Sequence, residues 1–161
     1  MQGGQEFSPV WNVGRLMLYE LVYDSMAVQR NLQGEELLRI LQSSRKHNLE
    51  WGITGLLLYH HGEFVQLLEG EREAVRQLYY DVLCKDVRHT ALTVAWEQAV
   101  HHRSFPDWSM GFAKPLDLDP ARTQGLEGYL RDGVKGLDPC GPGSVGRQLL
   151  LSIYRQMDPV V

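Results

Sequence analysis

Residues 52–70, GITGLLLYHHGEFVQLLEG, contain the pattern that decides the fold. Two apolar runs, 53–59 and 63–69, lie on either side of the short segment His60-His61-Gly62. This arrangement is typical of two antiparallel strands joined by a tight turn. The other predicted elements are placed around this hairpin.

The segments before the hairpin predict a strand and a helix. Residues 16–23, LMLYELVY, are apolar on both alternating faces except at Glu20, which predicts a central strand covered on both sides. Residues 34–48 place apolar side chains at helical spacing, with acidic residues in the first turn and basic residues in the last. A helix ending near Asn48 is therefore expected.

The segments after the hairpin complete a recognisable order of elements. Residues 75–83 predict a second amphipathic helix, and residues 91–100 predict a fourth strand. The order β-α-β-β-α-β predicts an α+β, ferredoxin-like sheet with two helices on one face. The other face needs a further cover, and residues 108–113 predict a short fifth strand.

The composition changes beyond residue 114 and divides the chain into three parts: an N-terminal extension 1–15, a sheet domain 16–114 and a helical tail 115–161. The tail predicts one helix from about Asp119 to Arg131 and a second over 144–157. The second helix has an apolar stripe that must dock on the bare sheet face or on a partner. The stripe consists of Leu149, Leu150, Ile153 and Met157.

Composition and charge limit the classes of function. The chain has 161 residues, 16 basic and 20 acidic, so its net charge of −4 disfavours a nucleic-acid partner. No apolar run approaches the roughly 18 residues that cross a membrane, and the first residues lack the pattern of a secretory signal. We therefore expect a cytoplasmic protein. Cys84 and Cys140 lack the spacing of a zinc site or a disulfide framework.

Polar residues at the predicted helix–sheet junction are candidates for ligand binding. Strand alternation places Gln66 on the same face as Phe64 and Leu68, where a buried amide needs partners. The helix face that carries Ile40 and Ser44 continues into His47 and Asn48. These groups and one tyrosine phenol would converge on a polar ligand, and carboxamides suit the alternating carbonyl and N–H edge of a flavin or pterin. The same residues also fit ordinary structural roles.

The sequence does not predict a metal site, a nucleophilic catalytic motif or a nucleotide-binding loop. The pairs His60-His61 and His101-His102 are adjacent, and adjacent side chains in extended chain point to opposite faces, so no metal site is predicted. The sequence has no GxSxG nucleophile motif, no GxGxxG and no P-loop.

Six blocks of the sequence together resemble the BLUF family of flavin-binding blue-light sensors. They run in order from about residue 16 to residue 112, so the resemblance is more specific than any single motif. The blocks are LVYDS (21–25), SSRKHN (43–48), GITGLLLY (52–59), GEFVQLLEG (62–70), DVRH (86–89) and FPDWSM (105–110).

The resemblance implies a ferredoxin-like fold with the flavin ring between the helices and the sheet. It assigns Tyr23 as the electron donor to the excited flavin and Gln66 as the amide that relays the proton. It also assigns Asn48 as the asparagine that hydrogen-bonds the flavin ring, and His47 occupies the preceding position. The implied cofactor is FAD, and FMN stays open.

The resemblance extends to a second group of positions. We include Ser44, Ile40 and Phe64 among the expected cofactor-binding residues, and Arg88 on the flavin's phosphate side. Trp108 and Met110 match positions implied in signalling. Asp81 stands where some relatives carry a flavin-contacting arginine, which is a departure from the family pattern.

The resulting interpretation is a photoreceptor in which light rearranges hydrogen bonds, reddens the flavin absorption and switches binding to a separate, unidentified partner protein. No substrate bond is broken, so an enzyme is not expected. We also expect a homodimer, because a bare sheet face favours self-association. The alternatives are a cofactor-free ferredoxin-like interaction module and an acylphosphatase-like enzyme. The second requires a glycine-rich anion loop that YDSMAVQRN, residues 23–31, does not supply.

Overall fold

The structure is a computed structural model that describes residues 17–32, 34–107, 109–113 and 143–157. Within this part of the chain the strands form one sheet in the order β4-β1-β3-β2-β5. The expected α+β, ferredoxin-like order with an additional strand is confirmed. The strands are β1 (Leu18–Ala27), β2 (Thr54–His60), β3 (Glu63–Glu71), β4 (His89–Val100) and β5 (Gly111–Ala113), and the helices are α1 (Gly34–Glu50), α2 (Arg72–Gln77) and α5 (Val145–Met157).

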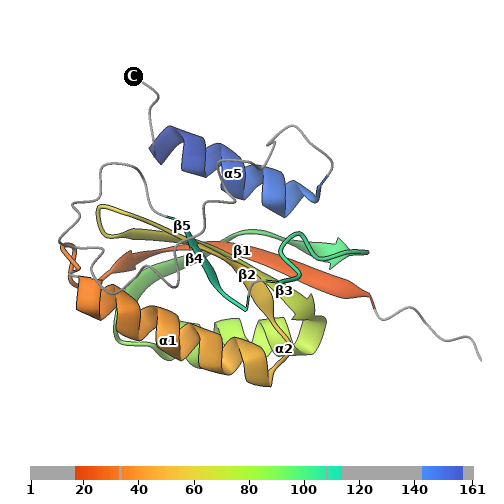
Figure 1. The fold of residues 1–161 in the computed structure, drawn as a ribbon, viewed down its shortest axis with the longest axis horizontal. Coiled ribbons are helices and arrows are strands. Elements are labelled where there is room, and N and C mark those ends of the chain that lie inside the picture. Colours follow the sequence, from red (N-terminus) through yellow and green to blue (C-terminus); the bar gives the residue numbers. More distant parts are fainter. Residues whose placement is uncertain (1–16, 33, 108, 114–142, 158–161) are drawn as a thin grey trace, which may run out of the picture.

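Strand β1 lies inside the sheet and is longer than the sequence predicts. It pairs antiparallel with β3 and with β4, and the pairing with β4 shifts register between Val22 and Tyr23 and again between Asp24 and Met26. Its residues are buried on both faces along most of its length. This explains its apolar character, because helices cover the sheet from both sides (Figure 1).

The hairpin between β2 and β3 turns at two left-handed residues, His61 with φ 46° and Gly62 with φ 88°. Two consecutive residues with positive φ match the twist of the flanking strands. A Cβ on Gly62 would lie 3.0 Å from the carbonyl oxygen of Arg30, so glycine is required there. The two histidine rings lie 4.0 Å apart. The two side chains do not point to opposite faces as extended chain predicts, because His61 lies in the turn.

Helices α1 and α2 cover one face of the sheet. Leu37 and Leu41 of α1 and Val75 of α2 pack with Leu21 and Leu68 in one buried cluster. Helix α1 ends just before Gly52, whose φ of 63° is typical of a helix C-terminal glycine. The second helical stretch is less regular than predicted, because α2 continues as a π-helical turn, Leu78–Val82, and a 3-10 turn, Leu83–Lys85.

Helix α5 covers the opposite face (Figure 1). Leu150 and Leu151 are buried against Val22, Leu67 and Phe105. The predicted tail helix over 144–157 is therefore present and docks on the sheet of its own chain. The buried stripe differs from the prediction, because Leu151 is 2% exposed whereas Leu149 is only partly buried.

The face under α5 also contains the buried carboxylate of Glu20. Its side chain is fully buried, and Oε1 accepts hydrogen bonds from Trp96 Nε1 at 3.3 Å, Gln98 Nε2 at 2.9 Å and the Gly146 amide at 3.1 Å. The Oε2 atom is buried and has no hydrogen-bond partner among the residues that the structure describes. Glu20 thus connects β1 to β4 and to the first turn of α5.

A second buried carboxylate, Glu69, is the cross-strand partner of Glu20 in the β1–β3 register. It accepts hydrogen bonds from the amides of Ser104 at 2.7 Å and Phe105 at 2.6 Å, and from Thr54 Oγ1 at 3.0 Å. Burial raises the pKa of Glu69, against the opposing effect of these donors and of Arg103. This carboxylate holds the connection that follows β4 against the sheet.

Several predicted features lie outside the described residues. They are the extension 1–15, the tail helix from Asp119 to Arg131, and Trp108. The predicted fifth strand begins later than expected, at Gly111, and pairs parallel with β2. No helix in the described ranges combines the length and the apolar composition that crossing a membrane requires.

Candidate functional site

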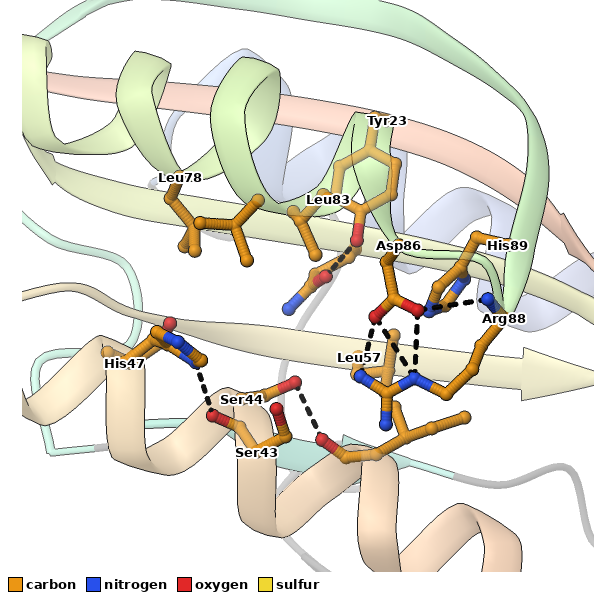
Figure 2. Close-up of a pocket in the computed structure, with 14 residues that line it drawn as sticks. Tyr23, Ser43, Ser44, His47, Leu57, Leu78, Leu83, Asp86, Arg88 and His89 are labelled. Carbon is orange, nitrogen blue, oxygen red and sulfur yellow. Dashed lines mark hydrogen bonds and ion pairs between the residues drawn. The ribbon is translucent and has the colours of Figure 1, made fainter.

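A crevice opens between α1 and the sheet and is closed on its far side by the turns that follow α2 (Figure 2). Helix α1 contributes Ile40, Ser43, Ser44, His47 and Asn48, the strands contribute Tyr23, Leu57 and Gln66, and the segment from the π-helical turn to the start of β4 contributes Leu78, Val82, Leu83, Asp86, Arg88 and His89. The volume of the crevice, including space open to solvent, is about 460 Å³.

Tyr23 and Gln66 are in direct contact at the floor of the crevice. They are cross-strand partners on β1 and β3, and both side chains are buried. The Tyr23 hydroxyl donates a short hydrogen bond to Gln66 Oε1. Burial, followed by the influence of Tyr79, raises the pKa of Tyr23, so the phenol keeps its proton in the ground state.

The amide of Gln66 continues this contact to Met110. Gln66 Nε2 donates to Met110 Sδ at 3.2 Å, and both groups are buried. A thioether sulfur only accepts and a carboxamide oxygen only accepts, so the two contacts of Gln66 fix which end of its amide faces each partner. Tyr23, Gln66 and Met110 thus form one directional chain of hydrogen bonds.

Helix α1 positions three further predicted residues at the crevice. His47 Nδ1 lies 2.9 Å from the Ser43 carbonyl oxygen, which only accepts, so Nδ1 carries the proton. Ser44 Oγ donates to the Ile40 carbonyl oxygen at 2.9 Å. The buried amide of Asn48 donates from Nδ2 to the carbonyl oxygen of Ser109, next to Met110.

Arg88 lines the crevice from its connection with β4 and is held by Asp86. Its guanidinium donates from Nε to Asp86 Oδ1 at 2.9 Å and from NH2 to Asp86 Oδ2 at 2.5 Å (Figure 2). Burial opposes ionisation of Asp86, but the hydrogen bonds from Arg88 outweigh it and lower the pKa of Asp86. Both side chains of this ion pair line the crevice.

Two further predicted positions lie outside the lining. Phe64 is buried on the same sheet face and packs against the rings of Tyr59 and His89, with ring centroids 4.9 Å apart in each case. Asp81, the departure from the family pattern, is exposed and pairs with Lys85 at 3.2 Å. Of the predicted signalling pair, Met110 is in contact with Gln66, whereas Trp108 lies outside the described residues.

Sequence reasoning missed part of the lining. Leu78, Val82 and Leu83 were identified only as an apolar helix face, and Asp86 and His89 only as letters within the DVRH block. Their convergence with α1 depends on how the turns after α2 pack. The DVRH block is the sequence feature that could have indicated Asp86 and His89. It is part of the family resemblance, but the resemblance assigns no role to these two residues.

The donor set fits a flat aromatic group with polar edges. Ile40 on α1 and Leu78 and Leu83 opposite it supply apolar walls, and the amides of Asn48 and Gln66 supply donors and acceptors at one end. The residues present are therefore compatible with the isoalloxazine ring of a flavin.

Known proteins with similar sequences include light-regulated enzymes and regulators. A Euglena gracilis protein named photoactivated adenylate cyclase subunit beta-like protein FB is 35% identical over 139 residues, which are 84% of this chain and 16% of that protein. The blue light- and temperature-regulated antirepressor BluF of Escherichia coli is 32% identical over 73 residues, which are 45% of this chain and 18% of that protein. The chain thus spans under a fifth of these relatives.

Solved structures agree with the fold. The dark-state structure of BlrB, a BLUF protein, has a TM-score of 0.59 and 30% identity, and the match covers 86% of this chain and 98% of that one. A bacterial light-regulated adenylyl cyclase has a TM-score of 0.60 and 30% identity, over 88% of this chain and 34% of that one.

The family model described as sensors of blue light using FAD matches residues 18–111. Neither the acylphosphatase-like enzyme nor the cofactor-free module is favoured by these matches. The chain belongs to the BLUF family of blue-light sensors.

Proposed function

We propose that this chain binds a flavin in the crevice and acts as a light-driven switch through Tyr23 and Gln66. The observation that carries the proposal is the buried, directional contact from Tyr23 through Gln66 to Met110. It joins a feasible electron donor, a reorientable amide and the segment leading into β5 in a single line.

The lining residues hold the flavin in this proposal. Asn48 and Gln66 offer amide groups to the ring, Ile40 forms an apolar wall, and Ser44, His47 and Arg88 also line the crevice. Phe64 supports the wall from behind, through its contact with His89. The flavin, when bound, supplies absorption of blue light and an excited state that accepts an electron.

Tyr23 supplies the electron and then the proton. Its phenol is a weak acid in the ground state, and loss of an electron makes it a strong acid. Its O–H already points at Gln66 Oε1, so the proton has a direct acceptor. Burial excludes water as a competing acceptor.

Gln66 converts this transfer into a structural change. An amide that receives a proton at Oε1 and releases one from Nε2 would tautomerise, with the released proton going to the bound flavin that took the electron, and an amide that rotates exchanges its donor and acceptor ends. Rotation places Oε1 instead of Nε2 toward Met110 Sδ and so removes this hydrogen bond, whereas the tautomer has a single N–H left with which to keep it. Met110 directly precedes β5, so the change reaches the edge of the sheet.

The output is a change in affinity for another protein. A sensor module of this kind breaks no substrate bond, and we infer that this chain signals by binding a downstream partner differently in the dark and in the light. The homodimer stays a prediction. Its premise, a bare sheet face, does not hold, because α5 covers that face within the chain.

The test is absorption spectroscopy of the purified full chain reconstituted with flavin. We expect a bound flavin whose visible band moves reversibly to longer wavelength under blue light, because a stronger donor to the ring stabilises its excited state. Gln66→Leu is expected to bind flavin and to lose this shift. Gln42→Leu, at an exposed position of α1, is the matched control and is expected to keep it. A chain that takes up no flavin would contradict the proposal.

A further inference from the structure

The segment that leads into β5 is held by α1 at two consecutive carbonyl groups. Asn48 Nδ2 donates to the carbonyl oxygen of Ser109, and Arg45 Nε donates to the carbonyl oxygen of Met110 at 3.3 Å. Arg45 and Asn48 are three positions apart on α1, so they lie on the same side of the helix. Helix α1 therefore determines where the backbone of residues 109–110 lies.

Met110 is held at two points by different partners. Its Sδ accepts a hydrogen bond from Gln66 Nε2 at 3.2 Å, and its carbonyl oxygen accepts one from Arg45. Met110 is fully buried, whereas Arg45 is half-buried. One contact thus comes from the amide to which the proposed function assigns the switch, and the other comes from α1.

Arg45 differs from its neighbours on α1 in its relation to the crevice. Ser44 and Asn48 line the crevice, but Arg45 is not among the described residues that line it. Its guanidinium is therefore placed to act on Met110 without touching the flavin. The contact that holds this segment can thus be changed separately from the contacts that hold the cofactor.

The two contacts of Met110 respond differently when the Gln66 amide rotates. Rotation removes the N–H donor from Met110 Sδ, which is a weak acceptor. The hydrogen bond from Arg45 does not involve the amide, and its donor is charged, which strengthens the bond to a carbonyl oxygen. The Met110 backbone therefore stays attached to α1 after the side-chain contact is broken, which favours the return of Met110 Sδ to Gln66.

We propose that Arg45 is a positioning residue that holds the Met110 backbone in its dark-state place and so speeds recovery from the light state. The inference rests on the proposed function, and it takes the arrangement with Gln66 Nε2 on Met110 as the dark state. Without Arg45, less opposes displacement of the segment that leads into β5. The light state then lasts longer.

The test follows the dark recovery of the light-induced absorption shift in the full chain loaded with FAD. Arg45→Met removes the donor and keeps an unbranched stem. It is expected to lengthen the recovery half-time at least roughly threefold, which is within the effect of one hydrogen bond on a rate. Flavin affinity, measured by fluorescence titration, and the size of the shift are expected to change by less than about twofold.

Two further variants separate the hydrogen bond from the charge. Arg45→Lys keeps a charged donor on a long stem and is expected to recover faster than Arg45→Met. Lys46→Met is the matched control, because Lys46 is the next residue of α1, is also basic and is exposed. It removes the same charge and is expected to leave the half-time unchanged.

The inference and the proposed function fail in different ways. An unchanged or shorter half-time in Arg45→Met would overturn the inference and leave the proposed function intact. The same holds if Lys46→Met slows recovery as much, if Arg45→Lys recovers as slowly as Arg45→Met, or if Arg45→Met clearly weakens flavin binding. An unmodified chain that shows no reversible shift would overturn the proposed function and the inference with it.

Discussion

Strands β1 and β3 present opposite chemistry on their two faces. Under α1 and α2, the cross-strand pair Tyr23–Gln66 is neutral and each member can donate or accept. The cross-strand pair Glu20–Glu69 lies three positions further along the same two strands. It faces α5, and both of its members are carboxylic acids. Both pairs are buried, so exposure to water does not distinguish them.

The difference teaches which face can change and which must stay fixed. A neutral amide can exchange its donor and acceptor ends without moving charge into a nonpolar interior. A buried carboxylate only accepts hydrogen bonds. If it loses its donors, nothing compensates for the hydration that the charge lost on burial, and the folded state is strongly destabilised. We therefore infer that the face under α1 and α2 carries the switch and the face under α5 holds the frame.

The largest expected effect lies on the first face. Tyr23→Phe removes the hydroxyl that bonds Gln66 and is expected to abolish the light-induced absorption shift, while flavin binding is kept. The cost in unfolding free energy is about 1 kcal/mol, typical of a lost hydrogen bond. Absorption spectra in the dark and under blue light are the measurement.

Tyr59→Phe is the matched control for this variant. Tyr59 is also a buried tyrosine on the same sheet face, and its hydroxyl donates to the Arg30 carbonyl oxygen at 3.1 Å. A similar loss of stability with a normal light response is expected. If the light response of Tyr59→Phe also disappears, it depends on packing rather than on the Tyr23 hydroxyl.

The next effect lies on the second face. Glu20→Leu leaves Trp96 Nε1, Gln98 Nε2 and the Gly146 amide without their acceptor and is expected to lower the unfolding free energy by about 3 kcal/mol. Glu20→Gln keeps one acceptor oxygen and is expected to recover at least half of this loss. Urea unfolding followed by tryptophan fluorescence measures both.

The light-induced absorption shift is expected to be kept in each Glu20 variant that folds. Its loss would mean that the two faces are not independent, and the proposed division of roles would be wrong.

A smaller effect is expected where α5 begins. A Cβ on Gly146 would lie 2.8 Å from Cδ of Glu20, closer than real contacts allow. Gly146→Ala is therefore expected to destabilise the protein by about 1–2 kcal/mol. Helix propensity alone predicts the opposite sign, so urea unfolding separates the two effects.

Val145→Ala, at the exposed neighbouring position, is the control and is expected to change stability very little. A stabilised Gly146→Ala variant would show that the contact between Glu20 and α5 is loose.

The smallest effect is a difference in pH dependence between the faces. Burial lowers the pKa of His89, so the unfolded chain binds a proton first and stability falls as the pH drops below 6.5. Burial raises the pKa of Glu69, so the folded chain binds a proton first and this group adds stability as the pH falls through its folded value. The two faces thus respond to acid with opposite sign.

Two variants isolate these contributions. His89→Gln is expected to flatten the loss of stability below pH 6.5, and Glu69→Gln is expected to steepen the loss at more acidic pH. Urea midpoints measured across this range are the readout. Relative to the unmodified chain, a change of slope in the same direction for both variants would contradict the assignment.

Much of the fold follows from local patterns in the sequence. Strand alternation and the turn residues predict the hairpin, and the doubly apolar run around residues 18–23 predicts a central strand. Helical spacing predicts α1 and α5. These patterns are short-range, because the side-chain period of a strand or helix depends only on the backbone conformation.

The candidate site follows from the sequence only in part. Strand and helix periodicity indicate Gln66 and Asn48 as candidates, and the family blocks add Tyr23, but no pattern predicts the partners of the two amides within the chain. Asn48 bonds Ser109, 61 residues away in sequence, and Gln66 bonds Met110, 44 residues away. Such contacts depend on how distant segments pack, which no local period encodes.

The sequence by itself determined the order of strands and helices, the face on which Gln66 points, and membership of a light-sensing family. Only the tertiary structure decided that Glu20 is buried and that α5 covers the second sheet face. The physical reason is that periodicity sets which side of an element is apolar. Which surfaces then meet is set by the packing of the whole chain.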